Sequence, residues 1–256
     1  DMVVHAAALK QVPATEYNPT ECIRTNIQGA ENVIEAAISE NIDKVIALST
    51  DKAGNPINLY GASKLVADKL FVAANNISKK SRTKFAVVRY GNVVGSRGSI
   101  VPFFKKLIDQ NSNFLPITDI RMTRFWLTLS DGVEFVIKSF ERMHGGEIFI
   151  PKIASARIID LANAMAPKLE KKIIGIRPGE KIHETLCPSE NATNTMDFKD
   201  HYIIIPSIEF DGKNNDYSKN RLNESGVLVS QDFEYSSGLN KDFLNEAQLL
   251  EINKKI

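Results

Sequence analysis

The sequence is poor in cysteine and has no long apolar run, and each absence excludes a class of protein. Its two cysteines, Cys22 and Cys187, are too far apart for a zinc motif and too few for a disulfide framework, which fits a reducing compartment. No apolar run approaches the roughly 18 residues of a membrane span, and the opening stretch lacks the flanks of a signal peptide. The sequence therefore predicts a soluble, cytoplasmic protein with no membrane partner.

The sequence also has almost no net charge. Its 32 Lys and Arg residues against 31 Asp and Glu give a net charge of +1, so no overall field attracts nucleic acid. We expect no nucleic-acid partner, and we expect any anionic ligand to be held by individually placed cations. The four histidines show no metal-ligand spacing, so no metal site is predicted. With 43% hydrophobic residues, the 256-residue chain has the composition of an ordinary globular protein.

The order of apolar segments predicts an α/β fold. Short continuous apolar runs at 2–8, 45–48 and 85–88 are typical of buried strands, and segments 18–37 and 60–75 have apolar residues at helical spacing. Strands joined by such helices run parallel, and continuously apolar strands have both sheet faces covered. The first part of the chain therefore predicts half of a doubly wound parallel sheet.

The later segments predict a smaller second lobe. We expect a helix over 99–111 and another that Ser130 caps and that ends at 144–146. Strands are predicted at 147–150, 172–176 and 202–205, and helices at 158–165 and near 241–254. These elements divide the chain into residues 1–150, which carry the sheet, and residues 151–256, which form the smaller lobe and a C-terminal cover.

Two segments place acid and base side chains where a parallel sheet binds ligands. Thr50, Asp51 and Lys52 follow the second strand, and Tyr60 and Lys64 begin the next helix. Tyr60 and Lys64 are four residues apart and share a helix face, so the ammonium is expected to lower the tyrosine pKa and make the phenol a usable base. Thr50 is predicted to hold the substrate oxygen that Tyr60 deprotonates, with Asp51 and Lys52 as an acid and a base.

Each pair also has a purely structural interpretation. A tyrosine and a lysine four residues apart are common on an exposed helix, and adjacent charges such as Asp51 and Lys52 are usually solvated. Their position at the mouth of a parallel sheet favours the catalytic interpretation.

Six motifs in one order resemble the extended short-chain dehydrogenase/reductase family. They are HAAALK at 5–10, STDKA at 49–53, NLYGASK at 58–64, RYGNV at 89–93, RMTRFW at 121–126 and RPGEK at 177–181. More narrowly, the chain is similar to the inverting UDP-N-acetylglucosamine 4,6-dehydratases, which begin pseudaminic acid synthesis. The resemblance implies a partial Rossmann fold in which residues 1–150 bind NAD(P) and residues 151–256 bind the nucleotide sugar.

The resemblance also implies how the residues act. Tyr60 would take the proton of the sugar 4-hydroxyl, and Lys64 would hold the nicotinamide ribose and lower the tyrosine pKa. Lys52 would remove the proton of carbon 5 and Asp51 would protonate the departing 6-hydroxyl, although the two roles could be exchanged. Reprotonation from the opposite face would invert carbon 5. The implied cofactor is NADP, with NAD open, and the implied substrate is UDP-N-acetylglucosamine.

The family's binding residues can be carried over by position. Those implied to contact the cofactor are Ala6, Ala7, Tyr60, Lys64, Tyr90 and Gly91. Those implied to contact the substrate are Lys10, Asn92, Thr118, Met122, Arg124, Arg177 and Glu180. Arg177 would hold the diphosphate and Glu180 the uridine ribose, although Pro-Gly between them is also typical of a surface turn. Arg124 could instead stack on Phe125 and Trp126. The family further implies a homo-oligomer, with a hexamer as its usual form, and a product that is used to glycosylate flagellin.

One expected family feature has no counterpart. The family holds the cofactor pyrophosphate at a glycine-rich strand-turn-helix, and three strand-helix units of roughly 25 residues would supply it, so about 75 residues are expected before Asp1. We therefore expect these 256 residues alone to be inactive. Two related activities stay open, a UDP-amino-sugar 4-epimerase and a retaining 4,6-dehydratase. A third alternative is a non-catalytic protein that binds NADP or a nucleotide sugar.

Overall fold

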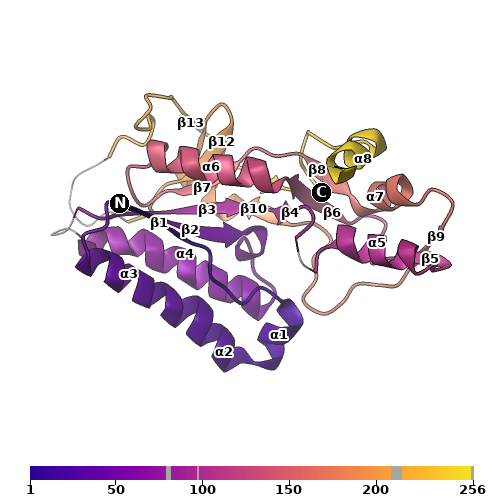
Figure 1. Ribbon diagram of the computed structural model, residues 1–256. Helices are drawn as coiled ribbons and strands as arrows, with labels where there is room; N and C mark the ends of the chain where they lie inside the picture. The colour runs from indigo at the N-terminus through magenta and orange to yellow at the C-terminus, as the bar shows by residue number, and fades with distance from the viewer. Residues whose placement is uncertain (79–81, 97, 209–214, 255–256) are drawn as a thin grey trace.

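A computed structural model describes residues 1–78, 82–96, 98–208 and 215–254 (Figure 1). The helices are α1 (Val12–Tyr17), α2 (Pro19–Ile23), α3 (Gly29–Ser39), α4 (Leu59–Ile77), α5 (Ile100–Asp109), α6 (Leu129–Arg142), α7 (Ile158–Met165) and α8 (Glu246–Lys254). The strands of the largest sheet are β1 (Met2–His5), β2 (Lys44–Thr50), β3 (Lys84–Tyr90), β7 (Ile148–Pro151), β11 (Thr195–Asp197), β12 (His201–Ile204) and β13 (Val227–Leu228). The shorter strands are β4 (Asn92–Val93), β5 (Phe114–Ile117), β6 (Thr123–Leu127), β8 (Ser155–Arg157), β9 (Glu170–Ile173), β10 (Thr185–Cys187) and β14 (Tyr235–Ser236).

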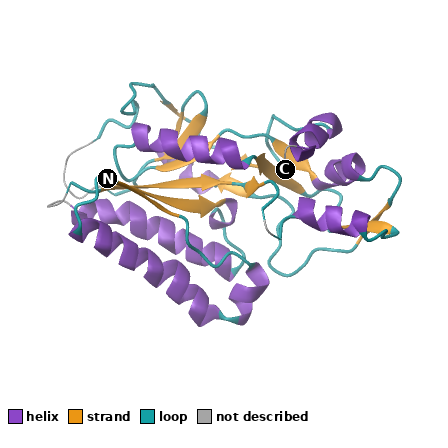
Figure 2. Cartoon of the chain, in the orientation of Figure 1, coloured by secondary structure: helices purple, strands orange, loops and turns teal. Residues whose placement is uncertain are grey.

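The largest sheet has the order β1-β2-β3-β7-β12-β11-β13. Its first four strands run parallel, and β12, β11 and β13 extend it in antiparallel pairs. Helices α1 to α4 cover one face and α6 lies on the other, as Figure 2 shows. This arrangement confirms the predicted α/β fold with a doubly wound parallel sheet of Rossmann type.

Two apolar cores cover the faces of this sheet, and a third builds the smaller lobe. Phe71 of α4 and Phe85 of β3 belong to the first core, and Phe140 of α6 belongs to the second. The third core lies among α5, α7 and α8, at the right of Figure 1. Its members come from 94–126 as well as from 156–166, so segments on both sides of residue 150 build the smaller lobe.

Among the described residues β1 is an edge strand of the sheet, with Met2 66% exposed. Two local predictions are corrected by the structure. The cap of α6 is Thr128 rather than Ser130, because the Thr128 hydroxyl accepts a hydrogen bond from the Asp131 amide at 3.2 Å. The helix predicted over 18–37 is interrupted by one π-helical stretch at Arg24–Gln28.

Candidate active site

The end of β2 and the start of α4 lie close together. After Thr50 the chain forms a short 3₁₀ turn, Asp51–Ala53, and the Asn58 side chain caps α4 by accepting a hydrogen bond from the Gly61 amide at 2.8 Å. A Cβ atom on Gly61 would lie 2.3 Å from the Lys52 carbonyl oxygen, so only glycine permits this close approach. Gly61 thus allows the first turn of α4 to pack on the turn Asp51–Ala53, which holds two of the predicted catalytic residues and is called the catalytic turn below.

Tyr60 lies in a buried environment beside Thr50. The phenol is hydrogen-bonded to the Thr50 side chain, and burial raises its pKa to about 12, although the ammonium of Lys52 and the Thr50 hydrogen bond oppose that rise. The prediction of a lowered pKa is therefore wrong for the chain alone, because desolvation outweighs the nearby cations. The cation that acts on the phenol is Lys52 rather than Lys64.

Lys64 lies one helical turn after Tyr60 and is almost fully buried. Its ammonium donates a hydrogen bond to the Leu48 carbonyl at 2.7 Å, and burial lowers its pKa although the carboxylate of Asp68 opposes the shift. An ammonium has three donors, and among the described residues the Leu48 carbonyl is the one acceptor for them. Two donors are therefore left for a ligand.

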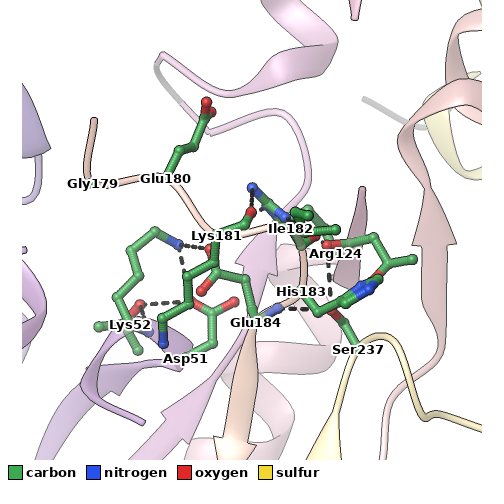
Figure 3. A network of polar contacts seen from close by, with 12 residues as sticks. Asp51, Lys52, Arg124, Gly179, Glu180, Lys181, Ile182, His183, Glu184 and Ser237 are labelled. Atoms are coloured by element: carbon green, nitrogen blue, oxygen red, sulfur yellow. Dashed lines mark hydrogen bonds and ion pairs between the residues drawn. The ribbon is translucent and has the colours of Figure 1, made fainter. Parts of the chain in front are cut away.

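The buried side chains of Asp51, Glu184 and Arg124 form one network of charges with the partly exposed Lys52 (Figure 3). The Lys52 ammonium donates to Asp51 Oδ1 at 3.0 Å and lies 3.4 Å from Glu184 Oε1. Burial alone would lower the Lys52 pKa, but the two carboxylates outweigh it and raise the pKa above its ordinary value. Lys52 is therefore protonated at rest.

Arg124 anchors the segment that carries Glu184. Its guanidinium donates to the carbonyls of Thr123, Lys181 and Ile182 at 2.7–3.0 Å and lies 3.7 Å from Glu184 Oε1. In the described part of the chain these bonds replace the stacking on aromatic rings that the sequence left open.

The RPGEK turn at 177–181 is joined to the catalytic turn. The Asn58 side chain donates to the Gly179 carbonyl at 2.8 Å, and the Lys181 ammonium donates to the Gly54 carbonyl at 2.7 Å. Arg177 is exposed and pairs with Glu180 at 3.4 Å, and the Glu180 side chain points away from the buried charges in Figure 3. The turn thus lies at the surface and its backbone is attached to the site, and the contacts of Arg177 and Glu180 with the substrate stay predictions.

The other predicted residues are placed at different depths. Ala6 and Ala7 are exposed after β1, and Gly91 packs so closely on Phe125 that a Cβ would lie 2.4 Å from its side chain. Tyr90 is partly buried at the end of β3, and Asn92 Oδ1 is buried without a hydrogen-bond partner among the described residues. Its unpaired oxygen is a ready acceptor for a ligand.

Three predicted substrate residues are not joined to the charged network by any polar contact between described residues. Lys10 is exposed on the loop before α1, Thr118 is buried after β5, and Met122 belongs to the core of the smaller lobe.

A family model described as "Polysaccharide biosynthesis protein" matches residues 1–206. This chain belongs to that family. A relative from Campylobacter jejuni subsp. jejuni serotype O:2, named UDP-N-acetylglucosamine 4,6-dehydratase (inverting), is 61% identical over 98% of this chain and 75% of its own length. A relative from Rickettsia massiliae named UDP-glucose 4-epimerase is 45% identical over 91% of this chain and 68% of its own length.

Solved structures support the same fold for this member of the polysaccharide biosynthesis family. The X-ray structure of Pen from Bacillus thuringiensis is 32% identical and superimposes with a TM-score of 0.84, covering 100% of this chain and 76% of that one. Two structures at 19% identity, one with NAD bound and one with NADPH, share the fold with TM-scores of 0.63 and 0.58. In the described residues of this family member, no helix is both long and apolar enough to cross a membrane.

Sequence reasoning missed Glu184. It is separated from Asp51 and Lys52 by more than 130 residues of sequence, and only the packing of β10 against the catalytic turn brings it there. The one available signal was its position, three residues after Lys181 and directly before an apolar strand, where a buried carboxylate needs a partner.

Replacing Gly54 with alanine should destabilise this arrangement. A Cβ at this position would lie 2.2 Å from the Thr185 carbonyl oxygen, so β10 would have to move away from the catalytic turn. Overpacking of this kind costs about 1–3 kcal/mol, which urea unfolding would measure. Gly29→Ala in α3 is the matched control, since its Cβ would meet only an ordinary contact at 3.7 Å. Equal stability of the two variants would refute the close-approach argument.

Proposed function

We propose that this protein removes water from UDP-N-acetylglucosamine to give a UDP-2-acetamido-2,6-dideoxy-4-keto hexose with inversion at carbon 5. The observation that carries the proposal is the ion pair of the buried Asp51 with Lys52 beside Tyr60, with 3.0 Å between the ammonium and the carboxylate. An oxidation at carbon 4 needs one base, and elimination across carbons 5 and 6 needs an additional base and acid. The inverting dehydratase at 61% identity supports the same assignment.

The described residues fit a nicotinamide cofactor, which we propose to be NADP. Lys64 has two ammonium donors for the ribose hydroxyls, and the buried Asn92 Oδ1 lacks a partner. When bound, the cofactor supplies a hydride acceptor for carbon 4 and later returns the hydride to carbon 6. Tyr60 takes the proton of the 4-hydroxyl. The pKa of the phenol is about 12 in the chain alone. The positive charge of an oxidised nicotinamide ring nearby would lower this pKa.

The Asp51–Lys52 pair holds one proton between its two groups, and its location decides which group is the base. At rest the proton is on Lys52. Its transfer along the 3.0 Å hydrogen bond to Asp51 leaves a neutral amine and a neutral carboxylic acid. Lys52 then takes the proton of carbon 5, whose electron pair forms the bond to carbon 6. Asp51 gives its proton to the departing 6-hydroxyl, which leaves as water.

We extend the proposal to the substrate's other end and to the protein's setting. Arg177 would pair with the diphosphate and Glu180 would accept hydrogen bonds from the uridine ribose, both from the turn that Asn58 and Lys181 tie to the site. We further propose that the protein acts in the cytoplasm as a homo-oligomer, a hexamer by family resemblance, and that it supplies pseudaminic acid synthesis and flagellin glycosylation.

A 4-epimerase is the second candidate, because a UDP-glucose 4-epimerase is 45% identical. Epimerisation needs only the Tyr60 base and hydride transfer in both directions. It gives no task to a buried acid and base at carbons 5 and 6, whereas the structure keeps Asp51 0% exposed against Lys52. The dehydratase therefore accounts for more of the site.

Mass spectrometry of the product separates these functions. The full gene product would be incubated with UDP-N-acetylglucosamine and NADP, and we expect a UDP-sugar that is lighter by one water. A product of unchanged mass, identified as the galacto isomer, would favour the epimerase. Binding of NADP with no change in the sugar would favour a non-catalytic binding protein.

A further inference from the structure

Glu184 is a buried carboxylate that the proposed reaction leaves without a role. It is 2% exposed, and its Oε2 atom has no hydrogen-bond partner among the described residues. Burying an ionised carboxylate without full hydrogen bonding is costly, so a purely structural role would be better served by a neutral side chain. The position therefore calls for an explanation in terms of the groups that Glu184 contacts.

The backbone around Glu184 is firmly held. Its amide donates to Ser237 Oγ at 2.9 Å, its carbonyl accepts from the Ser237 amide at 2.8 Å, and strand β10 begins at the next residue. Figure 3 shows the side chain pointing from this strand toward Lys52. A carboxylate on such a fixed backbone is suited to hold another side chain in position.

The charges around Glu184 are Asp51, Lys52, Arg124 and Lys181. Burial raises the pKa of the Glu184 carboxyl, and the three cations oppose this rise. Two of them lie close to the same oxygen, Lys52 at 3.4 Å and Arg124 at 3.7 Å, and both cations favour the ionised form of the carboxylate. Lys52 thus lies between two carboxylates, Asp51 and Glu184. In the proposed reaction only Asp51 transfers a proton to the substrate.

We infer that Glu184 is a positioning residue for Lys52, which fixes the amine over the reacting carbon and stabilises the positive charge that Lys52 gains from carbon 5. The inference rests on the proposed dehydration. In that step the carbon 5 proton forms a new N–H bond on a neutral amine, and an ammonium develops 3.4 Å from the Glu184 oxygen. Glu184 neither gives nor takes a proton. It acts mainly on elimination, since oxidation at carbon 4 leaves the charge of Lys52 unchanged and that charge still lowers the Tyr60 pKa.

The test compares Glu184→Gln with Glu184→Asp in the full gene product. The glutamine keeps the shape and removes the charge, whereas the aspartate keeps the charge on a shorter side chain. We expect Glu184→Gln to lower kcat for dehydration about 10- to 100-fold, the range found when a group that orients a reactive side chain is removed. Reduction of NADP in a single turnover, which reports oxidation at carbon 4, should change less than about twofold.

The pH profile separates positioning from a structural role. A nearby anion favours the protonated pair, so loss of the Glu184 charge should move the alkaline limb of kcat to lower pH. Glu184→Asp should recover part of the rate and return the limb toward that of the unsubstituted protein. Glu234→Gln is the matched control. Glu234 accepts a hydrogen bond from Thr185 Oγ1 at 3.3 Å beside the same strand pair but makes no ion pair with Lys52 in the described part of the chain.

The outcomes distinguish the inference from the proposed function. If the unsubstituted protein forms no dehydrated sugar, both are overturned. If it does, and Glu184→Gln keeps its rate and pH profile, only the inference is overturned. Equal losses in oxidation and dehydration, or a better rescue by glutamine than by aspartate, would mark Glu184 as structural and would also overturn it.

Discussion

Replacing Tyr60 with phenylalanine is expected to abolish both oxidation at carbon 4 and all later steps. The substitution keeps the ring in its buried position and removes only the oxygen that faces Thr50. Loss of a general base costs about 10²- to 10⁴-fold. Single-turnover reduction of NADP should therefore fall by about 10²- to 10⁴-fold, and no product should accumulate.

Tyr202→Phe is the control for this experiment. Its ring packs on Phe233 and Tyr235, and its hydroxyl makes no hydrogen bond with another described residue. This variant should oxidise the substrate at the normal rate. A Tyr60→Phe protein that still reduced NADP readily would show that another group is the base, and the proposed site would have to be rebuilt around it.

Replacing Lys52 with methionine should stop the reaction halfway. Tyr60 would still deprotonate the 4-hydroxyl, so NADP should be reduced, but the carbon 5 proton would have no base and elimination should fall by about 10²- to 10⁴-fold. The expected signature is a reduced cofactor with a sugar that keeps its 6-hydroxyl. Normal dehydration by Lys52→Met would remove Lys52 from the mechanism.

The same substitution should also make stability strongly dependent on pH. Asp51 and Glu184 are 0% and 2% exposed, and without Lys52 they would be two buried carboxylates with no shared cation. Removing one partner of a buried ion pair lowers the free energy of unfolding by about 3–5 kcal/mol. Burial already raises the pKa of Glu184, and loss of the Lys52 charge would raise it further, so the variant should be most stable below the unfolded glutamate pKa of about 4 and lose stability as pH rises. Urea unfolding at two pH values would measure this difference, and an equal free energy at both would contradict it.

The fold could be predicted from sequence because its signals are local. Apolar runs marked β2 and β3, helical periodicity marked α4, and Tyr60 and Lys64 fall on one helix face by spacing alone. The errors arose where tertiary context decides. Thr128 rather than Ser130 caps α6 because its extended backbone directs the hydroxyl to the Asp131 amide.

The chemistry of the site was harder to predict, because charge states depend on burial. The spacing of Tyr60 and Lys64 suggested a lowered tyrosine pKa, but burial raises the pKa and outweighs the opposing charge of Lys52. Glu184 could not be found from spacing. It reaches Lys52 because Gly54 lets the backbone at Thr185 pack closely on the catalytic turn. Arg124 donates to three backbone carbonyls that no spacing in the sequence indicated, and its predicted contact with the substrate stays a prediction.

The most direct test of the account is proton NMR of the full gene product turning over UDP-N-acetylglucosamine and NADP in deuterated water. The account predicts a new 6-methyl signal, deuterium at carbon 5 and couplings of the L-arabino configuration, because the proton removed by Lys52 is replaced from solvent on the opposite face. A 6-methyl signal with the original configuration would contradict inversion. Absence of the methyl signal, with a 4-epimer in its place, would contradict the assignment of Asp51 and Lys52 as an elimination pair.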